Sequence, residues 1–105
     1  MIKNSKTIDL ITFKQAECVY ELIAIVEQDE CKFQDIKWLL QEKINAYLIY
    51  ALDGQLFVDY SNAAGSKVEI LVQAHGDLPD DFRPFFTQLV EAVTKEGLTL
   101  KFEKL

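Results

Sequence analysis

The sequence predicts an α+β domain, a two-layer α/β sandwich in which two helices cover one face of a mainly antiparallel sheet of about five strands. Residues 34–54 carry apolar side chains at steps of three and four and end at a glycine, which is typical of a helix with one buried face. A second pattern of this kind covers residues 79–96. The intervening runs are short and rich in β-branched and aromatic residues, which favour strands.

The chain begins with two strand patterns. The first six residues are mostly polar and are expected to fray. Residues 7–13 and 18–27 then have strand character and are joined by a short polar turn, which favours an antiparallel hairpin. Both faces of the second strand are largely apolar, so we expect it to lie centrally in the sheet.

The first helix follows a polar loop at residues 28–32. Its apolar stripe consists of Ile36, Leu39, Leu40, Ile44, Tyr47, Leu48 and Ala51. Its opposite side carries Lys37, Gln41, Glu42 and Asn45. Gly54 is expected to end the helix, because glycine adopts the left-handed conformation without a Cβ clash.

Two strands and a second helix are expected in the rest of the chain. Residues 56–60 and 67–75 are interpreted as a second hairpin around the turn at 61–66, with a loop or a helical extension as the alternative for 56–60. The helix at 79–96 opens with a proline and two aspartates, which suit a first turn and the positive end of the helix dipole. Its stripe consists of Phe82, Phe85, Phe86, Leu89, Val90 and Val93. After Gly97, residues 98–103 alternate as a last strand. This gives the order β-β-α-β-β-α-β, with the strand order in the sheet left open.

Length and charge limit the classes of function. A chain of 105 residues, half of them hydrophobic, is expected to form a single domain over residues 1–105. No apolar run approaches the length of a membrane span and no secretory signal is recognisable, so we expect a cytoplasmic protein without a membrane partner. The net charge of −6 argues against nucleic acid, because phosphate binding needs clustered Lys and Arg. It permits a basic protein partner, and solubility is the simpler explanation of the charge.

Residues that carry chemistry are scattered along the chain. His75 is the only histidine, and the spacing of the two cysteines, Cys18 and Cys31, matches no zinc or redox motif. No glycine-rich phosphate loop is present. The sequence therefore predicts no catalytic residue, no metal ligand and no cofactor. The alternative is a small-ligand or enzyme module in which His75 faces a cysteine in a closed pocket.

Acidic residues gather in the two loops that precede the helices. We expect these loops near one edge of the sheet, where a combined negative patch would steer a basic partner; the simpler explanation is that acids before a helix complement its dipole. Phe33, Trp38 and Tyr50 lie beside the apolar stripe and are either interface anchors or an extension of the core. The residues predicted to bind a partner are Glu27, Asp29, Glu30, Asp35, Trp38, Asp77, Asp80 and Asp81.

A family resemblance rests on the segments TIDLITF, LLQEKINAYL with the glycine of DGQL, KVEILV and GLTLKF. The chain resembles a family of small bacterial domains of about this length with no assigned function, and its most specific segment is residues 39–48. The resemblance implies a bacterial cytoplasmic protein and supplies no catalytic residue. In type, small acidic single-domain proteins of this kind are similar to immunity proteins of bacterial toxin systems, including contact-dependent inhibition.

The leading hypothesis is therefore a non-enzymatic immunity protein that binds and neutralises a cognate bacterial toxin, with a basic nuclease-type toxin as one candidate. A homodimeric scaffold is a further hypothesis, because a helix-free sheet face that is not fully polar needs a partner.

Overall fold

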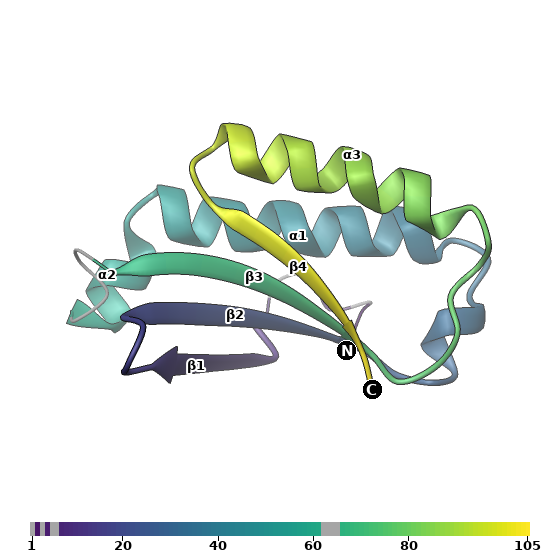
Figure 1. Ribbon diagram of the computed structural model, residues 1–105, viewed down its shortest axis with the longest axis horizontal. Helices are drawn as coiled ribbons and strands as arrows, with labels where there is room; N and C mark the ends of the chain where they lie inside the picture. The colour runs from purple at the N-terminus through teal and green to yellow at the C-terminus, as the bar shows by residue number, and fades with distance from the viewer. Residues whose placement is uncertain (1, 3, 5–6, 62–65) are drawn as a thin grey trace.

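The computed structural model describes residues 2, 4, 7–61 and 66–105. Its elements are β1 (Leu10–Lys14), β2 (Val19–Val26), the short 3-10 helix η1 (Glu30–Lys32), α1 (Ile36–Leu52), α2 (Gln55–Asp59), β3 (Lys67–Ala74), α3 (Phe82–Lys95) and β4 (Thr99–Lys104). The strands of this described part of the chain form one sheet in the order β1-β2-β3-β4. Helices α1 and α3 lie side by side over one face of this sheet (Figure 1), as the sequence predicted.

The sheet is mixed, which corrects the prediction of a mainly antiparallel sheet of about five strands. β1 and β2 form the predicted antiparallel hairpin, but β2 pairs with β3 and β3 with β4 in parallel. The segment predicted as a strand at 56–60 is instead the short helix α2. Because the described residues between α1 and β3 contain no strand, each long helix is a crossover that returns the chain to the same end of the sheet, and the next strand is parallel.

Local chemistry explains the helical turn at α2. Gly54 has a φ of +93°, a left-handed conformation that ends α1 and redirects the chain. The Asp53 side chain accepts a 2.9 Å hydrogen bond from the Gln55 N–H, and the Gln55 side-chain amide donates to Asp59 at 2.9 Å. Leu56 is fully buried and anchors the turn. Residues 62–65 of the predicted hairpin turn lie outside the described residues.

The core lies between the helices and the sheet. On β2 and β3 it takes the side chains that point toward the helices, among them Leu22, Ile70 and Val72, which are fully buried. The buried residues of α1 are Ile36, Leu39, Leu40, Lys43, Ile44, Tyr47 and Ala51. This confirms the predicted stripe except that Leu48 is only half-buried and that Lys43, which the prediction left out, is fully buried. Burial of each large aliphatic side chain contributes about 1.5–3 kcal/mol to stability.

The other face of the sheet combines aliphatic and charged rows. Ile23 and Leu71 are cross-strand neighbours and are only 4% and 7% exposed although neither α1 nor α3 covers this face. Beside them, Glu21 pairs with Lys14 at 3.4 Å and Glu69 with Lys101 at 3.1 Å. β2 is therefore buried on both faces and lies inside the sheet, as predicted.

Candidate functional site

The two acidic loops lie side by side at the carboxyl ends of the parallel strands. Gly76, after β3, is packed against Gln28, after β2, so closely that a Cβ on Gly76 would lie 3.3 Å from the Gln28 Cα. Lys37 in the first turn of α1 forms an ion pair with Asp81 at the start of α3. We call this region the carboxyl edge, comprising residues 27–35, residues 75–81 and the first turns of α1 and α3. Open sheets with parallel strands bind their ligands at this edge.

Two of the predicted acidic residues are neutralised at the carboxyl edge. Asp77 pairs with Lys104, and Asp81 pairs with Lys37. The hydrogen bond and the charge of each lysine hold the pKa of its aspartate below the usual range. Both pairs are exposed, so they stabilise the fold little. Because of these two ion pairs, the net negative charge of the carboxyl edge is smaller than its number of acidic residues indicates.

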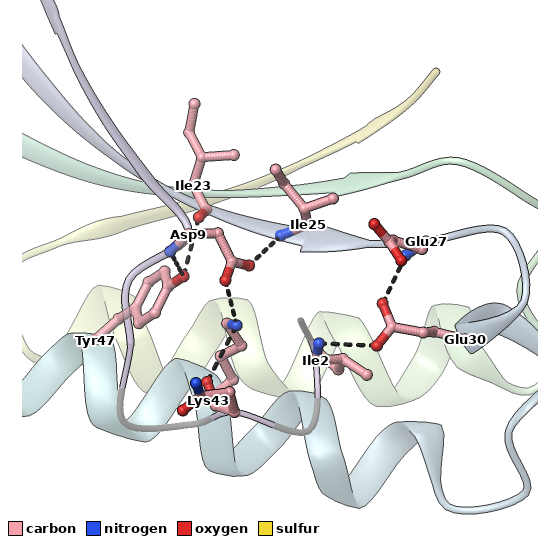
Figure 2. Close-up of polar contacts among 9 residues, drawn as sticks. Ile2, Asp9, Ile23, Ile25, Glu27, Glu30, Lys43 and Tyr47 are labelled. Carbon is pink, nitrogen blue, oxygen red and sulfur yellow. Dashed lines mark hydrogen bonds and ion pairs between the residues drawn. The ribbon is translucent and has the colours of Figure 1, made fainter.

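Glu30, one of the residues predicted to bind a partner, is held inside the loop before α1. Its side chain is buried and accepts hydrogen bonds from the N–H of Glu27 at 2.9 Å and of Ile2 at 3.0 Å (Figure 2). Burial raises the pKa of Glu30, but the hydrogen bonds lower it, and the balance lies below the ordinary value. Ile2 is itself fully buried, so this part of the segment expected to fray is fixed against the loop.

The remaining predicted residues are all exposed and belong to the carboxyl edge. We define the acidic patch as Glu27, Asp29, Asp35, Asp80 and Trp38. The four carboxylates are exposed, and none of the ion pairs among the described residues involves them. Trp38 is 61% exposed and lies one helical turn after Asp35, with which it shares a face. The patch therefore combines available negative charge with one large aromatic side chain.

The other two aromatic candidates of the first helix region contribute to packing. Phe33 and Tyr50 are half-buried against the core, and the Tyr50 hydroxyl donates a 2.7 Å hydrogen bond to Asp59. Of the three aromatic residues considered as interface anchors, Trp38 alone extends into solvent.

An apolar groove of about 400 Å³, which the sequence analysis missed, opens beside the acidic patch. Its apolar lining includes Phe82 and Phe86 of α3 and Phe102 of β4, whose ring centroids are 5.5–5.7 Å apart. Phe102 is 40% exposed. The sequence placed Phe82 and Phe86 in the buried stripe of this helix; Phe82 is buried as predicted and Phe86 is half-buried. The groove forms because β4 is the last strand, so nothing among the described residues covers Phe102 on its outer side.

Comparison with known proteins decides the family. The sequence matches the family of unknown function DUF6572 over residues 1–105. The chain belongs to this family. This confirms the resemblance to a family of small domains without an assigned function. No curated protein matches the chain, and no solved structure does.

The histidine and the cysteines of this DUF6572 domain lie apart or in unsuitable surroundings. Cys18 precedes β2 and His75 follows β3, and because these strands run parallel the two residues lie at opposite ends of the sheet. Cys31 is 2% exposed, and burial together with the charges of Glu30 and Asp77 raises the pKa of its thiol. His75 is exposed. Cys18 and His75 therefore cannot form a nucleophile–base pair with each other, and the raised pKa of Cys31 disfavours its thiolate.

The described residues also lack two features, a metal-binding cluster and a membrane-spanning helix. The described residues contain no group of three His, Cys, Asp or Glu side chains placed to hold a metal ion. None of the described helices combines the length and apolar character needed to cross a bilayer.

A buried polar network under β2 is the second feature that the sequence analysis missed. The Lys43 ammonium lies 2.7 Å from the Asp9 carboxylate, whose other oxygen accepts a 2.9 Å hydrogen bond from the Ile25 N–H. The Tyr47 hydroxyl donates to the Ile23 carbonyl at 2.9 Å and accepts from the Asp9 N–H at 3.1 Å (Figure 2). β1 begins beyond Asp9, so this carboxylate takes the place of a strand partner for Ile25. The network fixes the start of β1 to α1 and is therefore structural.

Proposed function

We propose that this domain is a non-catalytic binding protein of the immunity type, which neutralises a basic protein toxin through the acidic patch. The observation that carries the proposal is the exposure of Trp38 one helical turn from Asp35, an exposed carboxylate that forms no ion pair with the other described residues. Tryptophan is the residue most enriched among the anchors of protein interfaces.

The chemistry of the patch favours a basic partner. The face of an indole ring attracts the ammonium or guanidinium group of a partner, by about 0.5–2 kcal/mol depending on solvation. Asp35, one turn before Trp38, and Asp80, at the neighbouring helix start, supply carboxylates for charge-assisted hydrogen bonds. The net charge of −6 adds long-range attraction, which accelerates association with a positively charged protein.

A nuclease toxin is the kind of basic partner that this surface fits best. Such a toxin binds phosphates with clustered Lys and Arg. A compact protein that presents carboxylates and an aromatic anchor can occupy the same cationic path and block the substrate. The proposal requires no catalytic group on this chain.

The proposal expects a toxin gene beside the gene of this protein, and the test uses the toxin domain that such a neighbouring gene encodes. Growth protection and the Kd of the purified pair would be measured for Trp38→Ala and for Asp35→Lys with Asp80→Lys. We expect the affinity to fall at least about tenfold for either variant, and the salt dependence of the association rate to decrease for the charge reversals. Glu96→Lys, an exposed reversal at the far end of α3, is the matched control and should bind like the wild type.

Two results would contradict the proposal. One is a neighbouring toxin that this protein neither binds nor neutralises. The other is a complex in which the Trp38 and aspartate variants bind as tightly as the Glu96 control, because the partner would then use a different surface.

A further inference from the structure

The outer edge of β4 has a defined hydrogen-bonding pattern. The N–H of Leu105, just after β4, donates to the Ala74 carbonyl of β3 at 2.9 Å. Backbone groups of successive residues in a strand point to opposite sides, so the N–H and C=O groups of odd-numbered residues face β3. Those of Leu100, Phe102 and Lys104 consequently face away from the sheet. An edge of this kind is a template for pairing with another strand.

We propose that a second copy of this chain pairs with this edge in antiparallel fashion, about a two-fold axis that passes between the two Phe102 residues. The two sheets then form one continuous sheet. Phe102 faces Phe102 of the second copy, and Leu100 faces Lys104 on either side of the axis. All three are residues whose backbone groups face outward, so each pair exchanges both of its N–H···O bonds.

Charge complementarity selects this register. With the axis at Phe102, Lys101 of each copy lies opposite Glu103 of the other on the helix-free face, and both side chains are exposed. An axis at Lys101, Glu103 or Lys104 would place that charge directly opposite itself, which is destabilising. An axis at Leu100 would pair only half of β4, because the strand begins at Thr99.

The usual protection of an edge strand is weakened in β4. Lysines on an edge discourage pairing because they carry uncompensated charge. Here Lys101 is paired with Glu69 at 3.1 Å, and Lys104 is paired with Asp77. Both lysines are thus neutralised within their own chain, and the edge can approach a second strand at a lower electrostatic cost.

The helix-covered side of the same edge offers an aromatic contact. Phe102, 40% exposed, already packs on Phe82 and Phe86 with ring centroids 5.7 and 5.5 Å away. In the pair, Phe102 of the second copy lies across from it and extends this aromatic cluster over the axis, at the groove that β4 leaves open. The two carboxyl edges point in opposite directions, and the strand pairing uses none of the acidic-patch residues, so the proposal does not depend on the proposed function.

The test is the oligomeric state of the full chain, measured by sedimentation equilibrium and light scattering from low micromolar to near-millimolar concentration. Wild type is expected to dimerise. Lys101→Glu and Glu103→Lys each place like charges opposite one another at two positions and should weaken the dimer at least about tenfold. The double variant restores the opposite charges across the axis and should recover most of the lost affinity, although it does not rebuild the Lys101–Glu69 pair within each chain. Glu42→Lys, an exposed reversal on α1, is the control.

Amide exchange supplies a measurement that does not depend on substitution. The amides of Phe102 and Lys104 should exchange quickly at low concentration and slowly at high concentration, while those of Lys101 and Glu103 stay protected at both because they bond to β3. A chain that is monomeric at every concentration would overturn the proposal, and its β4 edge would then be open to a strand of another protein. A dimer that the double variant fails to restore, or that leaves Phe102 exchange unchanged, would overturn it as well.

Discussion

Replacing Lys43 by methionine is expected to destabilise the fold by about 3–5 kcal/mol, the usual cost of removing one partner from a buried ion pair. The side chains of Lys43 and Asp9 are 0% and 5% exposed. Methionine fills the space of the lysine stem but leaves the Asp9 carboxylate buried without its cation. The Ile25 N–H remains as a donor, so we expect the lower half of this range.

The size of this effect makes it readily measurable. A small domain is stable by about 5–15 kcal/mol, so a loss of about 3 kcal/mol is a large fraction of the total. For a chain of this length it corresponds to a decrease in Tm of about 12–24 °C. Urea unfolding followed by far-UV circular dichroism gives the free energy directly and avoids reliance on Trp38, which is exposed in the folded state.

Two further variants separate charge pairing from other effects. Asp9→Asn with Lys43→Met removes both charges and retains an acceptor for Ile25, so the double variant should be more stable than the sum of the single losses by about 2–3 kcal/mol. Lys37→Met breaks an exposed ion pair on the same helix and should cost no more than about 1 kcal/mol. Equal losses for the Lys43 and Lys37 variants, or strict additivity in the double variant, would refute the reasoning.

Three other substitutions probe the fold. Glu30→Gln should destabilise the fold by about 1–3 kcal/mol at neutral pH. Folding lowers the pKa of Glu30, so the difference in unfolding free energy between wild type and variant should be complete above the ordinary pKa of 4.5. In urea unfolding at a series of pH values, this free-energy difference should shrink as the pH falls through the lower pKa of the folded state. Gly54→Ala forces a Cβ into a φ of +93° and should cost about 1–2 kcal/mol by thermal unfolding. Tyr47→Phe leaves the Ile23 carbonyl and the Asp9 N–H without their hydroxyl partner and should cost about 1–3 kcal/mol in urea. A loss below about 0.5 kcal/mol in any of the three would contradict its assigned contact.

The helices and the first hairpin could be predicted because their signals are local. The apolar steps of α1 and α3 are set by the helical repeat of 3.6 residues, which operates within one element. The short polar turn before Val19 leaves β1 and β2 no connection other than an antiparallel one. The predicted ends of these helices and strands lie within about three residues of the observed ends.

The sheet directions could not be predicted because they depend on one short segment. The alternation of Leu56 and Val58 suits a strand as well as a helical turn, and the left-handed Gly54 is compatible with both. Contacts decided between them, since the turn buries Leu56 and leaves Val58 76% exposed. Because this segment is helical, the sheet has one strand fewer than predicted, and β3 and β4 run parallel to β2.

The candidate site shows the same division. The sequence by itself determined which residues are acidic, which are apolar and that the acidic loops precede helices. Only the tertiary structure decided that Lys104 neutralises Asp77, that Glu30 and Lys43 are buried, and that Trp38 is exposed. The reason is physical: a helical or strand repeat acts over a few residues, whereas charge pairing depends on which distant segments meet, as with Lys43 and Asp9, which lie 34 positions apart.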